Sequence, residues 1–157
     1  NGGGHKMAAG IKIKKDSLNK FKSFLDDYFK DYSNNLFIKI NKYDSLLSVD
    51  KINSDLIDEI SKLEPFGAGN NEPQFIIKDI KIQKTQIIKD KHIMIFFQND
   101  FSTNLKGICF NCINSVLGDY LLNHKKYKFL IGCTIKKDNF SNIPLPQIIV
   151  KDAMIIN

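Results

Sequence analysis

The sequence predicts an α+β protein in which a short α/β segment precedes a five-stranded β-barrel. Three observations support this fold class. Residues 75–156 contain five runs rich in β-branched and aromatic residues, which favour strands. One segment between the third and fourth runs has helical spacing instead. Residues 1–63 combine a glycine cluster with two segments of helical spacing.

The composition is that of an ordinary folded domain with a basic balance. Of the 157 residues, 43% are hydrophobic and 25% are charged, which is enough for a buried core. All 23 basic residues are lysine, and the net charge of +6 permits attraction to a polyanion. Lysine offers only point charges, so bidentate contacts of the arginine type are excluded. No apolar run approaches the roughly 20 residues of a membrane-spanning helix, so we expect no membrane partner.

The cysteines and the first residue bear on the setting of the chain. An odd number of cysteines indicates reduced thiols in the cytoplasm and not a disulfide framework. Cys109 and Cys112 form a C-x-x-C pair, for which a zinc site and a redox pair are the weaker alternatives. A structural zinc usually needs four ligands, so we predict no metal here, but a buried thiol at a strand end and a second thiol at a helix start. Because the chain starts at Asn1 without methionine, we expect it to be the tail of a longer polypeptide.

The first elements follow the glycine cluster Gly2–Gly4, whose backbone can adopt angles that other residues avoid. We expect a brief helical turn over His5–Ala9 and a short half-buried strand over Ile11–Lys14. Asp16 and Ser17 are good caps for the long helix that follows. The apolar residues of this helix share one wide, aromatic face that suits packing on a sheet: Leu18, Phe21, Phe24, Leu25, Tyr28, Phe29 and Tyr32.

A second helix precedes the strand-rich half. Leu36–Ile40 is expected to form a strand, and Asn53 or Ser54 caps the helix after it. The buried face of this helix is expected to hold Leu56, Ile57, Ile60 and Leu63.

The second half has the element order of a known barrel. The expected strands are Phe75–Ile88, His92–Gln98, Leu105–Phe110, Tyr127–Ile135 and Gln147–Ile156. Helical spacing links Ile113, Val116, Leu117, Tyr120 and Leu121. Three strands, a helix and two strands within about 80 residues is the order of an OB-fold, a barrel that commonly binds nucleic acid. An unrelated small β-barrel is the alternative.

A glycine motif opens the chain as Gly-Gly-Gly-His-x-x-Ala-Ala-Gly. Unhindered amides before a helix start form an anion nest, and His5 can donate to a phosphate oxygen. The alternative is a glycine turn with an exposed histidine. The pattern resembles the substrate-binding motif of the DHHA1 domain, which occurs in DHH-family phosphoesterases. That resemblance implies that Gly2, Gly3, Gly4 and His5 bind a phosphate of the nucleic-acid backbone.

The segment Leu63–Phe75 forms a second motif. Its prolines fix φ and its glycines allow a tight path, which favours a stiff connector between domains. Pro-Phe-Gly-x-Gly-Asn followed by Glu-Pro-x-Phe is similar to RecJ-type exonucleases, although Asn71 stands where that family usually has proline. His92, Leu105–Asn111 and Pro146–Ile148 also resemble the oligonucleotide-binding domain of the family.

The resemblance implies a division of the chain. Residues 1–63 would be the C-terminal part of a DHHA1 domain with its following helices, residues 64–74 the connector, and residues 75–157 the OB-fold domain. It also implies the DNA-binding part of a 5′→3′ exonuclease specific for single-stranded DNA, used in DNA recombination and repair. The alternatives are a stand-alone single-strand-binding module and the tail of another DHH-family phosphodiesterase, such as a nanoRNase.

Catalysis is expected to lie outside this chain. In the family two divalent metal ions, Mn²⁺ or Mg²⁺, are held by a DHH domain whose Asp-His-His motif this sequence lacks. We therefore expect no catalytic or metal-binding residue here and no activity of the fragment alone. The implied partners are single-stranded DNA, the DHH domain in cis or as a separate chain, and single-strand-binding protein.

The barrel offers candidate DNA contacts. Along His92–Gln98, Ile93, Ile95 and Phe97 share the more apolar face and should be core. Phe96 lies on the other face, where it could stack on a base or be covered by a neighbouring domain. Five lysines lie where OB-folds usually meet a ligand, although any one of them could be merely solvated: Lys84, Lys89, Lys91, Lys136 and Lys137.

Overall fold

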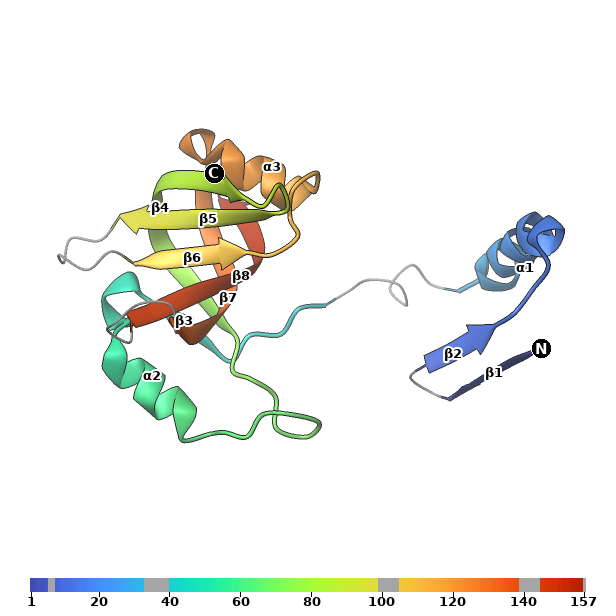
Figure 1. Cartoon of the computed structure of the whole chain (residues 1–157), viewed down its shortest axis with the longest axis horizontal. Coiled ribbons are helices and arrows are strands. Elements are labelled where there is room, and N and C mark those ends of the chain that lie inside the picture. The colour runs from blue at the N-terminus through green and yellow to red at the C-terminus, as the bar shows by residue number, and fades with distance from the viewer. Residues whose placement is uncertain (6–7, 33–39, 99–104, 139–144, 157) are drawn as a thin grey trace. The chain divides into compact units, whose positions relative to one another are not determined.

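The computed structural model describes residues 1–5, 8–32, 40–98, 105–138 and 145–156. The chain forms two compact units, Asn1–Asn41 and Lys42–Asn157 (Figure 1). Within the described ranges, no helix has both the length and the apolar character needed to cross a membrane.

The first unit starts with a β-hairpin. Strand β1 (Gly2–His5) pairs antiparallel with β2 (Ala8–Ile11), which places Gly4 opposite Ala9. The expected helical turn is therefore wrong, because the described residues of that segment lie in strands. A Cβ on Gly4 would lie 2.6 Å from the Cβ of Ala9, so this glycine permits the close approach of the two strands. The expected half-buried strand at Ile11–Lys14 is also wrong, since β2 ends at Ile11 and all four residues are exposed.

A single long helix follows the hairpin. The 3₁₀ turn η1 (Lys15–Ser17) leads into α1 (Leu18–Phe29), as the capping signals predicted, although Ser17 makes no side-chain capping hydrogen bond. The aromatic face of the helix stays largely exposed, with Phe24 59% and Tyr28 56% accessible. The expected strand Leu36–Ile40 lies outside the described residues except for Ile40, which is in no strand.

The second unit is a closed five-stranded barrel. Its elements are β4 (Phe75–Ile88), β5 (His92–Gln98), β6 (Lys106–Cys109), α3 (Val116–Leu122), the 3₁₀ turn η4 (His124–Lys126), β7 (Lys128–Asp138) and β8 (Leu145–Ile156). The strand order is β4-β5-β6-β8-β7, and β4 also pairs with β7 and so closes the sheet. The β6–β8 pair is parallel and the other barrel pairs are antiparallel. This is the OB-fold order that the sequence predicted.

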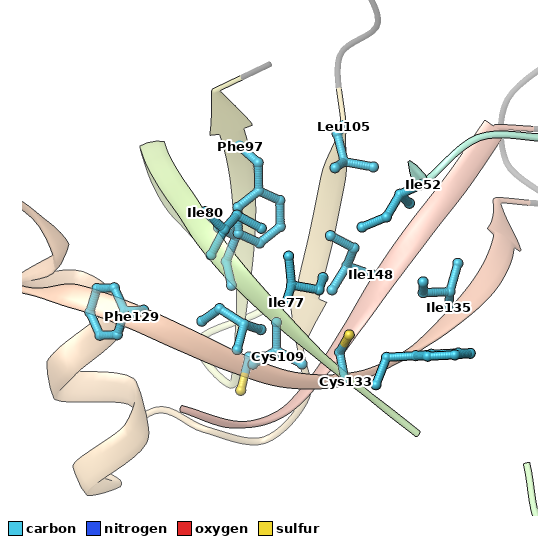
Figure 2. Close-up of a cluster of buried hydrophobic side chains, with 14 of the residues drawn as sticks. Ile52, Ile77, Ile80, Phe97, Leu105, Cys109, Phe129, Cys133, Ile135 and Ile148 are labelled. Atoms are coloured by element: carbon cyan, nitrogen blue, oxygen red, sulfur yellow. The ribbon is translucent and has the colours of Figure 1, made fainter. Parts of the chain in front are cut away.

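The core lies inside the barrel. Ile93 and Ile95 are fully buried and Phe97 is 3% exposed, as the alternation along β5 predicted. Buried isoleucines of the other strands join the same cluster, including Ile77 and Ile148 (Figure 2). Every second residue of a strand points inward, so the remaining positions are left for the outer surface.

Residues before the predicted barrel also belong to it. Strand β3 (Ser45–Leu47), which the sequence did not predict, pairs in parallel with the start of β4. The 3₁₀ turn η3 (Val49–Lys51) follows, and Ile52 after it is 6% exposed and part of the core cluster (Figure 2). The compact units therefore divide between Asn41 and Lys42, and not at residues 63–64 as expected.

Helix α2 (Ser54–Ser61) packs on the same unit. The Asn53 side chain accepts a hydrogen bond from the Leu56 amide at 3.1 Å, which confirms the predicted cap. Ile57 and Ile60 are buried as expected, but Leu63 is 53% exposed because the helix ends before it.

The proline- and glycine-rich connector is a tight loop inside this unit. The side-chain amide of Asn70 donates hydrogen bonds to the carbonyls of Leu63 at 2.7 Å and Pro65 at 3.0 Å. Phe66 packs against the core, and Phe75 is 7% exposed at the start of β4. The segment is stiff, as its composition predicted, but it joins α2 to β4 within one compact unit.

The first prediction concerns this boundary. A chain that begins at Lys42 should unfold cooperatively, with a midpoint close to that of the full chain. A chain that begins at Phe75 loses β3 and three buried isoleucines, each of which contributes about 1.5–3 kcal/mol. Urea unfolding followed by circular dichroism measures the difference, and limited proteolysis should leave a fragment that begins near Lys42. Equal stability of the two truncated chains would contradict the boundary.

The second prediction concerns packing around Gly107. A Cβ there would lie 2.7 Å from the Phe97 ring and 3.0 Å from the Ile148 carbonyl oxygen. Gly107→Ala should therefore lower the free energy of unfolding by about 1–3 kcal/mol, as overpacking does. Gly67→Ala is the matched control, because a Cβ at Gly67 meets nothing within 4 Å. Comparable urea midpoints for the two variants would show that the barrel interior accommodates the added methyl group without loss of stability.

Candidate nucleic-acid interface

The outer surface of the barrel carries a row of basic and aromatic side chains. The strand registers pair Lys84 with Phe96, Phe96 with Lys106, Lys106 with Gln147, and Gln147 with Lys136. Because paired residues share a face of the sheet, these five residues form one outward row, called here the basic–aromatic row. The row crosses all five barrel strands, which span residues 75–156 of the sequence.

Phe96 lies near the middle of the row. Its ring is half-buried, and the Nζ of Lys84 lies 5.8 Å from the ring centroid. Lys106 is its register partner on the other side. An aromatic face flanked by cations can stack on an unpaired base while the cations meet phosphates. The structure thus places Lys84 beside Phe96, two residues that the sequence proposed separately as DNA contacts, and adds Lys106, which was not among the proposed contacts.

The predicted lysines outside the centre of the row differ in their surroundings. Lys136 forms an ion pair with Glu72 at 3.1 Å, so part of its charge is already compensated. Lys137 follows it and is exposed, but strand alternation directs it away from the row. Lys89 and Lys91 lie in the exposed β4–β5 turn, and Lys91 is five residues, or about 17 Å along the strand, from Phe96. These lysines are therefore separate from the Phe96 cluster.

A second aromatic group lies at the start of β5. The rings of His92 and Phe110 meet edge to face with centroids 5.3 Å apart, and Phe110 is 53% exposed. The Nδ1 of His92 accepts a hydrogen bond from the Asn111 amide at 2.9 Å. In a neutral ring the proton is then on Nε2, which can donate. The sequence signal for this pair was only the family resemblance of His92 and of the segment that holds Phe110.

The glycine motif lies in the first unit. His5 is exposed at the end of β1, and the described residues around it form a hairpin without a helix start. The anion nest that the motif predicted requires amides at a helix start, so that physical basis is not present in the described residues. Gly2, Gly3, Gly4 and His5 remain predicted phosphate ligands.

The C-x-x-C pair consists of two buried thiols: Cys109 ends β6, as predicted, but Cys112 is not at a helix start, because α3 begins only at Val116. The Cys112 thiol donates to the Cys109 carbonyl at 3.2 Å, and all three cysteines are free and buried. Burial raises the pKa of the Cys109 thiol and raises the pKa of the Cys133 thiol to about 12. Within the described ranges, no three His, Cys, Asp or Glu side chains gather in a way that could hold a metal ion.

Comparisons with known proteins agree with the barrel fold. Residues 43–152 match the family described as the RecJ OB domain. The chain is 25% identical over 156 residues to the single-stranded-DNA-specific exonuclease RecJ of Bacillus subtilis (strain 168), a match covering 98% of this chain and 19% of that protein. The crystal structure of Thermus thermophilus RecJ in complex with Mn²⁺ is similar, with a TM-score of 0.58 and 18% identity over 98% of this chain and 22% of that one. The chain spans about a fifth of the length of these relatives.

The third prediction concerns the thiols. Burial shields all three thiols and disfavours the thiolate of Cys109 and Cys133, so at pH 8 the native chain should react with Ellman's reagent far more slowly than the urea-unfolded chain, whose thiols have pKa values of about 8.5. The raised pKa also ties stability to pH. The contribution of Cys133 to the free energy of unfolding is full below about pH 8.5, the pKa of an unfolded thiol. It falls as the pH rises toward the folded pKa of about 12. Rapid modification of three thiols in the native state would contradict their burial.

Proposed function

The chain belongs to the RecJ OB domain family through residues 43–152, and from this premise we propose that it is the DNA-binding part of a RecJ-type exonuclease. The observation that carries the proposal is the position of Phe96 between Lys84 and Lys106 on the outer face. A base can stack on the ring, and its flanking phosphates can meet the two cations.

The proposed substrate is single-stranded DNA. Stacking on Phe96 needs an unpaired base, which a duplex does not offer. Little sequence preference is expected, because the chain has no arginine for a bidentate contact to guanine. The family match makes the tail of a nanoRNase the weaker reading, since that class is not expected to carry this barrel.

Hydrolysis is assigned in this proposal to residues outside the chain. The divalent metal ions that the resemblance implies do not fit the described residues, which offer no cluster of three suitable ligands. The chain alone is therefore proposed to be inactive. The resemblance supports two partners, a DHH domain in cis or as a separate chain and single-strand-binding protein. It also supports a role in DNA recombination and repair. The cysteine usage supports a cytoplasmic setting. The same resemblance supports a phosphate contact by Gly2–His5, with an exposed His5 as donor.

The fourth prediction separates stacking from charge. Phe96→Ala should weaken binding of an unpaired oligonucleotide by about 1–3 kcal/mol, the contribution of one base stacked on an aromatic ring. The slope of log K against log salt should stay unchanged, because no charge is removed. Lys84→Gln with Lys106→Gln should instead flatten the slope by about 1.4, at about 0.7 per phosphate contact. Fluorescence anisotropy of a labelled oligonucleotide across a salt series measures both effects.

The control for charge is Lys125→Gln with Lys126→Gln, two exposed residues of η4 that lie outside the basic–aromatic row. This variant has the same net charge and should leave the slope closer to that of the parent chain. Equal affinity for duplex and single strand, with no effect of Phe96→Ala, would reject the proposed role of the barrel surface.

A further inference from the structure

The barrel contains a pocket where β4 changes its pairing partner. Strand β4 pairs with β7 as far as Ile80, which lies opposite Phe129, and with β5 from Lys81, which lies opposite Gln98. The register to both neighbours shifts near this point. A pocket of about 470 Å³ lies here, a volume in the range of small-molecule sites.

The pocket has an apolar floor and a charged rim. Phe129, Ile82 and Ile156 line it together with Tyr127, a residue that is 36% exposed. Tyr127 is held edge to face between Tyr120, with centroids 5.3 Å apart, and Phe129, with centroids 6.2 Å apart. A planar aromatic ligand suits such a lining, because stacked and edge-on ring contacts are favourable.

The rim carries a net positive charge. Lys81 and Lys128 line the pocket with Asp79, and all three are exposed. Two cations against one carboxylate favour an anionic group at the mouth of the pocket.

His124 lines the pocket and has a ring nitrogen that is unpaired among the described residues. Its Nδ1 lies 3.2 Å from the Leu121 carbonyl oxygen, which can only accept, so Nδ1 carries the proton of this hydrogen bond. The Nε2 of the neutral ring is then an acceptor. It is buried and has no hydrogen-bond partner among the residues that the structure describes. Buried polar atoms are nearly always paired, so this atom is suited to an N–H donor brought by a ligand.

The pocket adjoins the basic–aromatic row. Gln98 lines the pocket and lies two residues after Phe96 on β5, on the same face and about 7 Å away. A strand of DNA that stacks one base on Phe96 can therefore place a nearby nucleotide at the pocket.

We propose that this pocket holds one unpaired nucleotide of single-stranded DNA, an inference that rests on the proposed function. The base lies against Tyr127 and the apolar floor, and one of its N–H groups donates to His124 Nε2. The phosphate meets Lys81 and Lys128 at the rim. The pocket thus adds a second nucleotide subsite beyond Phe96.

Two variants test the pocket. Lys81→Gln with Lys128→Gln removes the rim cations, and Lys125→Gln with Lys126→Gln is the matched control, because it has the same charge and neither of its residues lines the pocket. His124→Asn keeps an amide donor for the Leu121 carbonyl and removes Nε2. Anisotropy with a labelled single-stranded oligonucleotide should show that both pocket variants bind about fivefold or more weakly than the control. This factor corresponds to the lower end of the free energy that one stacked base contributes.

A second readout locates the base. An oligonucleotide containing 5-iodouracil, irradiated with the full chain, should cross-link to Tyr127 as well as to Phe96. The Tyr127 cross-link should weaken in both pocket variants, while the Phe96 cross-link persists. Thermal midpoints are recorded for every variant, and the exposed lysine pair provides the decisive result if His124→Asn is destabilised.

The outcomes separate this inference from the function on which it rests. If binding depends on Phe96, but the pocket variants bind as tightly as the control and no cross-link forms at Tyr127, the pocket is not a nucleotide subsite. The proposed function then still stands. Failure of the parent chain to bind the oligonucleotide overturns both.

Discussion

The barrel closes through β4, which hydrogen-bonds to β7 along its first half and to β5 along its second half. Closure leaves the five barrel strands with an inside and an outside, so alternation along each strand decides which residues are core and which are surface. Asp79, with φ of 54°, lies at the irregular point where β4 changes partner. The pocket lined by His124 and Tyr127 lies at the same change of partner, so the proposed second subsite lies beside the point at which the barrel closes.

Alternation separates the residues that stabilise the barrel from those that face a ligand. Phe97 is buried against the core, while its neighbour Phe96 is turned outward between lysines. The exposed contacts of the outer face add little to folding. A cation–π contact such as Lys84 with Phe96 contributes about 0.5–1 kcal/mol at an exposed site, and a surface ion pair such as Lys136 with Glu72 about 0–1 kcal/mol. The lysines of this face can therefore change with little effect on the core.

The two compact units differ in how much of their own apolar surface they bury. The second unit buries isoleucines between residues 52 and 148 in one cluster, including Ile52 and Ile60 from the segment before the predicted barrel. In the first unit the aromatic face of α1 remains exposed at Phe24 and Tyr28, and the described residues of that unit contribute nothing to the core cluster. This contrast explains why the compact boundary falls at Lys42 and why the Pro- and Gly-rich loop, although stiff, is not a domain linker.

The sequence by itself determined the order of the barrel elements, the inward face of β5, the Asn53 cap and the buried thiol of Cys109 at a strand end. These features depend on periodicity and on contacts within one turn, which neighbouring residues encode directly. The tertiary structure alone decided that Lys106 lies beside Phe96, that Lys136 is paired with Glu72, and that residues 42–63 join the barrel. It also decided that the glycine motif forms a hairpin, since a run without side chains carries no pattern of faces. Register between strands distant in sequence is set by closure of the whole sheet, and no local pattern records it.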